Sequence, residues 1–196
     1  MRLELAPGSV VNEEDLQTRT GIGRTPIREA LHRLQRDQLV AVIPRRGMFV
    51  SQIELGDLAL VFESRSILEP YVHRLAAERG RSEHWDAMSF ALDHAVALGP
   101  DAPWSELLAA DRICHEQVWA AADNRFLTQT LDMLYCQAER LWHRYVRDQA
   151  DLVSALAEHR TILESLRAGD GEAAAKLIEG HVREFENQTR VVLAGM

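Results

Sequence analysis

Residues 20–34, TGIGRTPIREALHRL, decide the fold of the N-terminal quarter of the chain. A Gly-x-Gly turn opens the stretch, and Pro26 then falls in the first turn of a helix, where its missing N–H costs nothing. Apolar side chains recur at the spacing of one helix face, at Ile27, Ala30, Leu31 and Leu34. Polar and basic side chains fall on the opposite face, at Arg24, Arg28, His32 and Gln35. The stretch therefore predicts a turn followed by an amphipathic helix with a basic outer face.

A shorter helix precedes this stretch and a hairpin follows it. Asn12 stands before three acidic residues, which is the pattern of an N-cap and first turn, and it predicts a helix that ends near Arg19. Residues 39–43 and 48–51 are mostly apolar and flank a turn at residues 44–47, so they predict two paired strands. Helix, turn, helix and hairpin is the order of a winged helix-turn-helix, a DNA-binding module.

The charge of the chain is unevenly distributed. The net charge of −8 would argue against a nucleic-acid partner if it were uniform. Residues 1–52, however, carry 8 basic and 6 acidic residues, whereas residues 53–196 carry 14 and 24. Six arginines fall between Arg24 and Arg46. This asymmetry indicates a basic interaction module joined to an acidic body.

From Leu55 onward the sequence carries no strand signal and predicts six helices, separated by breaks rich in Gly, Pro, Asp and Asn. Their expected ranges are 56–79, 82–98, 102–122, 124–147, 149–168 and 170–194. The fold class is therefore mainly α. We expect a winged helix-turn-helix at residues 1–52, followed by an antiparallel six-helix bundle at residues 55–196.

The two cysteines and the lack of targeting signals indicate the compartment. Cys114 and Cys136 fall within helical patterns and form no disulfide-like framework, which is typical of buried thiols in a reducing environment. The sequence shows no signal peptide and no apolar run long enough to span a bilayer. We therefore expect a cytoplasmic protein with no membrane partner.

Four polar residues stand where the helical pattern calls for apolar ones: Asp111, His115, His159 and His181. Asp111 and His115 share an apolar stripe of one helix, and the other two histidines each lie on the stripe of a later helix. Burying unpaired polar groups is costly, and a divalent metal would satisfy all four at once. The alternative is a metal-free core of hydrogen-bonded histidines, which is the commoner role of a single inward His.

Several motifs resemble those of a known family of regulators. Residues 21–31, GIGRTPIREAL, resemble the recognition-helix signature of the GntR family of bacterial transcription regulators, and residues 44–50, PRRGMFV, resemble its wing. The rest of the chain resembles the all-helical FCD domain of the FadR subfamily. The matching segments are RSILEP at 65–70, Asp111-x-x-x-His115, EHR at 158–160 and GHV at 180–182. Six helices resemble the VanR branch of that subfamily.

The resemblance implies a DNA-binding regulator that binds a palindromic operator as a homodimer. The residues that it assigns to DNA contact are Arg24, Thr25, Arg28, Arg45, Arg46 and Gly47. It implies one zinc, nickel or manganese ion per chain, held by the four inward residues named above. Neighbouring Glu116, Glu158 and Arg160 should point away by helical phase.

The resemblance also implies a small carboxylate effector in the cavity beside the metal. Arg65 lies on the inward stripe of its helix and is the main candidate to bind it, with Arg140 as a second candidate. The alternative for Arg65 is a surface ion pair with Glu69, four residues on, worth only about 0.3–0.5 kcal/mol.

The chain departs from the family pattern at its beginning. The winged domain of the family usually has a helix before residues 5–9, and this chain begins too late to include it, so the start is trimmed or misassigned, or the domain is loosely packed. We therefore expect the chain as given to bind DNA weakly. Gly23 also stands where the family commonly has a capping Ser, and Cys114 where it usually has Phe.

A metal-dependent enzyme is the competing function, because an open metal position can activate water. The His115-Glu116 pair lacks the second histidine of a zincin helix, and no separate general base is evident. A basic DNA-binding module also has no use in a hydrolase. We therefore expect a regulator and not an enzyme.

Overall fold

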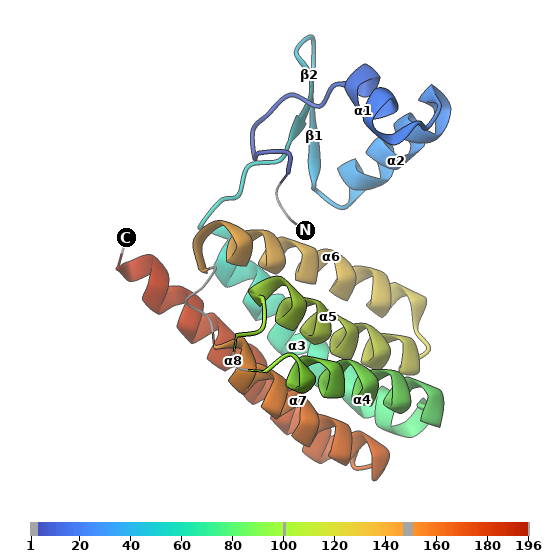
Figure 1. Cartoon of the computed structure of the whole chain (residues 1–196), viewed down its shortest axis with the longest axis vertical. Coiled ribbons are helices and arrows are strands. Elements are labelled where there is room, and N and C mark those ends of the chain that lie inside the picture. Colours follow the sequence, from blue (N-terminus) through green and yellow to red (C-terminus); the bar gives the residue numbers. More distant parts are fainter. Residues whose placement is uncertain (1–3, 100, 147–150, 196) are drawn as a thin grey trace. The chain divides into compact units, whose positions relative to one another are not determined.

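The computed structural model describes residues 4–99, 101–146 and 151–195. The chain forms two compact units, Met1–Asp57 and Leu58–Met196, whose elements are labelled in Figure 1. The described residues are mainly helical, with one small sheet. This is the predicted fold class.

Unit 1 has the element order of a winged helix-turn-helix. It contains α1 (Glu13–Thr20), α2 (Arg24–Arg36), β1 (Val40–Ile43) and β2 (Gly47–Val50). Asn12 caps α1 as predicted, because its Oδ1 accepts hydrogen bonds from the N–H groups of Glu14 and Asp15, at 2.9 and 3.3 Å. Gly23 begins α2 without a side-chain hydrogen bond, which leaves the first turn of this helix without a side-chain cap.

The two strands are antiparallel and cover one face of α2. Val40 lies opposite Val50, and an isolated bridge between Val10 and Phe49 extends the sheet. The core of unit 1 has four buried members: Val11, Ile27, Leu31 and Val40. Ala30 lies on the predicted apolar stripe but is exposed, since the core side chains pack against Ile27 and Leu31 and leave Ala30 uncovered.

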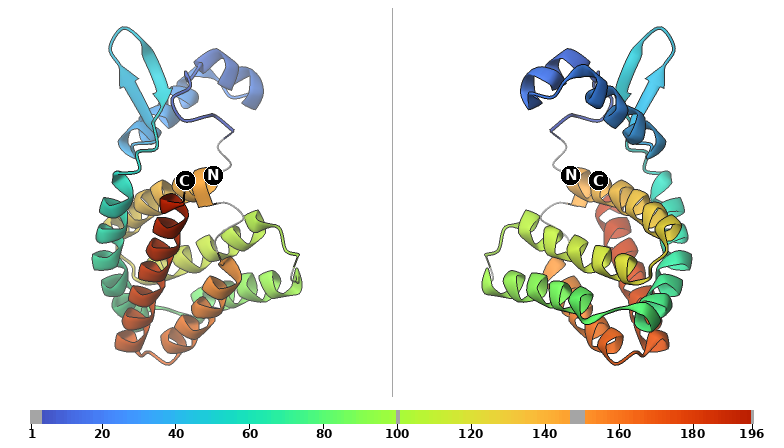
Figure 2. Two further views of the ribbon diagram at one scale, coloured as in Figure 1. Left: turned by 90° about the vertical axis from the view of Figure 1, so that its left-hand side faces the viewer. Right: turned by 90° about the vertical axis from the view of Figure 1, so that its right-hand side faces the viewer.

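Unit 2 consists of six α-helices among its described residues. They are α3 (Asp57–Arg79), α4 (Ser82–Ala97), α5 (Trp104–Ala121), α6 (Arg125–Leu141), α7 (Leu152–Arg167) and α8 (Gly171–Ala194). α4 packs against α5 and α7, and α7 packs against α8, so the helices enclose a common core (Figure 2). Predicted helical residues 147, 149 and 150, and the predicted break at residue 100, lie outside the described part.

The helix expected at 124–147 is not a uniform α-helix. α6 ends at Leu141 and continues as a π-helical turn, η1 (Trp142–Val146). Trp142 and Val146 are both buried, and the Trp142 ring packs against Phe185 with their centroids 4.5 Å apart. A π turn changes the phase of the helix at that point, so both side chains face the core. Periodicity alone does not predict such a change.

The core of unit 2 contains an unusual number of ionisable groups. Its buried polar residues are Arg65, Glu69, His73, Asp111, His115, Glu139, Arg140, His159, His181 and Thr189. Charged side chains are rarely buried unless they are paired or bind a metal. These residues therefore locate the candidate site.

Candidate metal centre

The structure brings the four predicted ligands together from three helices. Asp111 and His115 lie one turn apart on α5, His159 lies on α7 and His181 lies on α8. Each is at most 4% exposed. One candidate ligand atom from each residue lies within 4.8 Å of those of the other three.

All three histidines turn Nε2 toward the Asp111 carboxylate. Its Oδ1 lies 2.9 Å from Nε2 of His159 and 3.8 Å from Nε2 of His181, and its Oδ2 lies 3.9 Å from Nε2 of His115. Ligands about 2.0–2.2 Å from an ion lie at most about 4.4 Å apart. The four atoms lie close enough together for the residues to fit one divalent metal.

Two of the three histidines have a carboxylate at their outer nitrogen. Nδ1 of His181 donates to Oε2 of Glu158 at 2.7 Å, and Nδ1 of His115 lies 3.5 Å from Oε1 of Glu69. Nδ1 of His115 and Nδ1 of His159 are both buried, and neither forms a hydrogen bond among the described residues. Carboxylates in this position orient metal-binding imidazoles and raise their basicity.

Glu158 points away from the centre of the cluster, as predicted, yet it contacts one of the candidate ligands from outside. Its side chain is half-exposed and does not face the centre of the cluster, but it is long enough to reach from α7 to the outer edge of His181 on α8. The other two neighbours point away as predicted. Glu116 pairs with Arg112 at 2.7 Å, and Arg160 pairs with Asp93 at 2.6 Å.

Tyr135 on α6 holds the remaining carboxylate oxygen. Its hydroxyl donates to Oδ2 of Asp111 at 2.6 Å. Burial raises the pKa of Tyr135 well above 10, and the negative charge of Asp111 raises it further, so the hydroxyl keeps its proton. Burial opposes ionisation of Asp111, but the hydrogen bond from His159 and the nearby histidines hold the pKa of Asp111 far below its usual value. The carboxylate is therefore anionic and has the charge needed to bind a cation.

Arg65 on α3 lies beside the four candidate metal ligands and is 1% exposed. Its Nε and Nη2 donate to Oε1 of Glu69 at 3.3 and 3.0 Å, and Nη2 also lies 3.4 Å from Nε2 of His115. Trp119 donates from Nε1 to the other oxygen of Glu69 at 3.1 Å. The surface ion pair considered as an alternative is therefore excluded, because the pair is formed but lies in the core.

Arg140, the second candidate for effector binding, is 2% exposed on α6 and donates to Oε1 of Gln137 at 3.0 Å. Both cysteines are buried and unpaired, as predicted. Burial raises the pKa of each thiol, so neither is an activated nucleophile.

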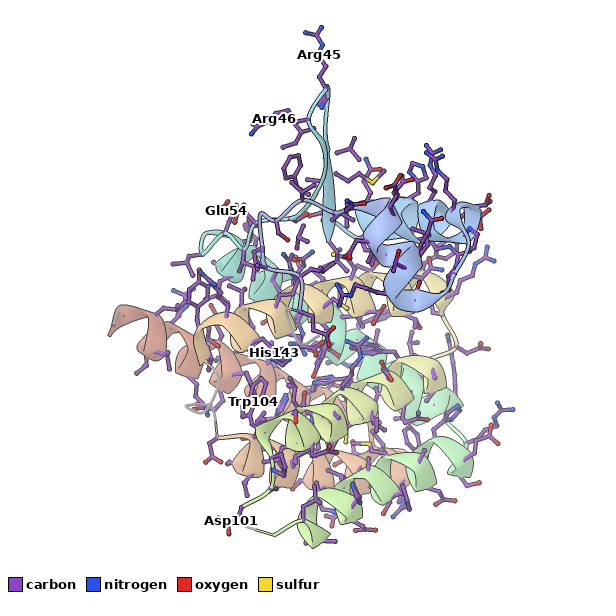
Figure 3. All side chains as sticks on the ribbon, turned by 45° about the horizontal axis from the view of Figure 1, so that its top comes forward. Arg45, Arg46, Glu54, Asp101, Trp104 and His143 are labelled. Carbon is purple, nitrogen blue, oxygen red and sulfur yellow. The ribbon has the colours of Figure 1, made fainter. Side chains whose placement is uncertain are left out.

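The predicted DNA-contacting residues lie on the surface of unit 1. Arg24 and Arg28 on α2 are exposed and share one partner, Glu13 of α1, at 3.5 and 3.6 Å. Arg45 and Arg46 point outward from the hairpin tip (Figure 3). Arg45 has a positive φ of 63°, and Gly47 follows at 101°, a conformation that favours glycine and keeps this turn narrow.

Five residues contact the predicted site residues but were not themselves predicted to belong to a site: Glu13, Glu69, Trp119, Tyr135 and Glu158. Glu69 was seen only as a possible surface partner of Arg65. Trp119 stands four residues after His115, on the same face of α5, and a polar N–H on a buried stripe is a signal that a partner is needed. Tyr135 gives the same kind of signal on α6.

The buried histidines make the stability of the fold dependent on pH. Burial lowers the pKa of His73 and His115 to about 4, against the pull of Glu69. The unfolded chain, with pKa values near about 6.5, binds more protons, so stability is full above that pH and falls as pH drops toward 4. Each histidine contributes about 1.4 kcal/mol per pH unit in this window.

We therefore expect metal-stripped protein to lose about 2–3 kcal/mol of unfolding free energy between pH 6.5 and 5.5. Urea titrations at both pH values measure this. Replacing the exposed His94 with Gln should leave the difference unchanged. Equal stability at the two pH values would show that these histidines are not buried in their neutral form.

Comparison with known proteins places the chain in a family. A model of the FCD domain matches residues 60–184, and a model of the bacterial regulatory proteins of the gntR family matches residues 1–50. The chain belongs to the GntR family of bacterial regulators. Its winged helix-turn-helix is thus the GntR module, and its helical unit is an FCD domain.

Similar GntR-type sequences are named as transcriptional regulators. The chain is 27% identical over 203 residues to an uncharacterized HTH-type regulator in an unstable DNA locus of Streptomyces ambofaciens, covering 97% of this chain and 80% of that one. It is 21% identical to the HTH-type transcriptional repressor RspR of Escherichia coli, covering 96% and 82%. The GntR chain is accordingly a transcriptional regulator and not an enzyme.

Known structures share the fold of this GntR protein. McbR/YncC of E. coli superposes with a TM-score of 0.79 at 19% identity, over 91% of this chain and 85% of that one. The metal-free FCD domain of the regulator TM0439 gives a TM-score of 0.60 at 17% identity, over 72% and 96%. None of the helices in the described part of the chain has the length and apolar character needed to cross a bilayer.

Proposed function

We propose that this GntR-family regulator binds a palindromic operator as a homodimer through residues 1–52. We further propose that a small organic acid, bound beside a divalent metal in residues 55–196, modulates that binding. The observation that carries the proposal is the buried cluster of one aspartate and three histidines, with the Arg65 guanidinium 3.4 Å from one of its inward nitrogens. A metal and a guanidinium this close form a site for an anion.

The donor set supports a borderline divalent ion. Three imidazoles and one carboxylate suit zinc, nickel or manganese, and the ion bound depends on availability as well as affinity. Asp111, His115, His159 and His181 would hold it. In a five- or six-coordinate ion, four protein ligands leave positions for water or for an effector oxygen.

The charges around the cluster favour an acidic effector. A divalent ion and Arg65 would bring three positive charges, against one negative charge each from the buried Asp111 and Glu69. Among the described residues, the hydrogen bonds of Arg65 use Nε and Nη2 and none uses Nη1. A small carboxylate would neutralise the excess charge by pairing with both cations.

An exposed apolar stripe on α3 supports the homodimer. Leu60, Ile67 and Tyr71 lie on one face of this helix and are 61, 68 and 53% exposed. Large apolar side chains that gather on one exposed helix face are typical of an interaction site. A second copy of the chain would cover it and would present two recognition helices to the two halves of a palindrome.

Arg28 is expected to read a base in each half-site. Its side chain is 52% exposed on the outer face of α2, and arginine suits bidentate contact with guanine in the major groove. Replacing Arg28 with Ala should cost about 1–3 kcal/mol and relax specificity at one position. Arg45→Ala, at the wing tip, serves as the comparison and should weaken all sequences alike. Binding to selected and scrambled duplexes measures both, and unchanged selectivity in Arg28→Ala would remove it from the readout.

Calorimetry with a panel of mono- and dicarboxylates tests the effector proposal. The titrations use zinc-loaded wild type, metal-stripped wild type and an Arg65→Lys variant, which keeps the positive charge but not the forked geometry. We expect a ligand that binds the zinc-loaded wild type and binds the other two at least tenfold more weakly, as the loss of a charge-assisted pair implies. Equal binding to all three would show that neither the metal nor Arg65 contacts the effector.

A further inference from the structure

Glu69 is a buried carboxylate with several charged and polar neighbours, and it belongs to no predicted site. It is 0% exposed on α3. One oxygen, Oε1, accepts from Arg65 and lies 3.5 Å from Nδ1 of His115, while Oε2 accepts from Trp119. Burial opposes its ionisation, but His115 and Arg65 hold its pKa far below the usual value. One carboxylate therefore contacts both a candidate metal ligand and the candidate effector-binding cation.

One contact of His115 favours a particular position for its proton. Arg65 is only a donor, so the 3.4 Å approach of its Nη2 to Nε2 of His115 favours the tautomer that has its lone pair on Nε2. In the neutral imidazole the proton then lies on Nδ1, which faces Glu69. This is the tautomer that a metal at Nε2 requires.

We propose that Glu69 is a shared positioning residue that couples metal binding at His115 to anion binding at Arg65. The inference rests on the function proposed above and adds the link between its two ligands. Oε1 of Glu69 accepts two hydrogen bonds from the guanidinium of Arg65 and lies 3.5 Å from Nδ1 of His115, close enough to orient the imidazole by charge, although the two form no hydrogen bond.

The coupling follows from competition for one lone pair. In the tautomer favoured above, Nε2 of His115 accepts from Nη2 of Arg65, and the same lone pair would be needed to bind an ion. A bound metal would therefore end that contact and would leave an N–H of Arg65 directed at the site, next to a new positive charge. An anion pairs with that N–H and screens the repulsion between the two cations, so each ligand raises the affinity for the other.

Glu158 provides a matched control within the chain. Like Glu69, it is a carboxylate at the Nδ1 of a candidate metal ligand, His181, at 2.7 Å. Unlike Glu69, it is half-exposed and lies on α7, remote in sequence from Arg65. Changing either Glu to Gln weakens the support of one imidazole, but only the Glu69 change also alters Arg65.

The experiment measures the affinity for Co²⁺ by competition with a chelator, in matched concentrations of sodium acetate and sodium chloride. For wild type, acetate is expected to lower the Kd of Co²⁺ about fivefold or more. Both Glu69→Gln and Glu158→Gln should weaken Co²⁺ binding in chloride by about tenfold. Glu158→Gln should keep the acetate effect, and Glu69→Gln should lose it.

Three outcomes separate the possibilities. If Glu69→Gln keeps the full acetate effect, Glu69 does not couple the two sites. If wild type binds Co²⁺ with the same Kd in acetate and in chloride, there is no coupling between metal and anion, and the inference is also overturned. A wild type that binds no Co²⁺ instead defeats the proposed metal function. If Glu69→Gln does not fold, Arg65→Lys replaces it in the test. This variant should bind Co²⁺ no more weakly than wild type and lose the acetate effect, and an effect that survives in it overturns the inference.

Discussion

Alanine at both His159 and His181 is expected to reduce the bound divalent metal from about one ion per chain to none. The double variant keeps Asp111 and His115, but two ligands on one helix are too few for a stable site. Because binding energy adds to folding energy, the variant should also lose the rise in melting temperature that zinc gives the wild type. Elemental analysis and thermal melts, each with and without a chelator, measure the two effects.

The control for this result is alanine at His32 and His94, which are exposed and lie one in each unit. That variant should keep its metal and its zinc-dependent stabilisation. Full metal occupancy in the His159 and His181 variant would show that the ion binds elsewhere, and the four-residue assignment would be wrong.

Replacing Arg65 with Ala is expected to destabilise unit 2 by about 3–5 kcal/mol, because it leaves the Glu69 carboxylate buried without its cation. Adding Glu69→Gln should recover much of this loss, since a neutral amide still accepts from Trp119. Urea denaturation of wild type, the two single variants and the double variant forms the required cycle.

The matched control is Arg183→Ala on α8. Arg183 also pairs with a glutamate one turn away, Glu179 at 2.6 Å, but both side chains are exposed. Its loss should cost at most about 1 kcal/mol. If Arg65→Ala costs no more than Arg183→Ala, the Arg65–Glu69 pair is not the buried, coupled pair described above.

The sequence predicts the direction of the ligand side chains well, because helical phase is a local property. Asp111, His115, His159 and His181 break apolar stripes, and an inward polar residue is visible from the pattern alone. Phase does not say which residues from different helices meet. The sequence could therefore suggest a shared site, whereas the distances that make it one come from the packing of α5, α7 and α8.

The partners of the ligands were harder to predict. An Arg and a Glu four residues apart give the same pattern on a surface as in a core. The sequence alone therefore does not show that Glu69 is buried. Glu158 lies on the outer side of α7, and the helical periodicity correctly predicts that its side chain points away from the centre of the cluster. The reach of its side chain to His181 depends on how close α8 lies.

The N-terminal unit was predicted element by element, because caps and turns act locally. Asn12 and the Gly23–Pro26 segment mark where α1 and α2 begin. Features that depend on the packing of one element against another could not be predicted from such local signals. The exposure of Ala30 depends on how much of α2 the sheet covers, and the contact of Glu13 with two arginines depends on the angle between the helices.

The most direct test is the affinity of zinc-loaded protein for a selected operator, with and without the carboxylate found by calorimetry. Selection from random duplexes supplies the operator, and the His159 and His181 double-alanine variant supplies the control. The account predicts that the carboxylate changes the operator Kd of wild type about fivefold or more and leaves that of the variant unchanged. An operator Kd in wild type that is the same with and without the carboxylate would contradict it.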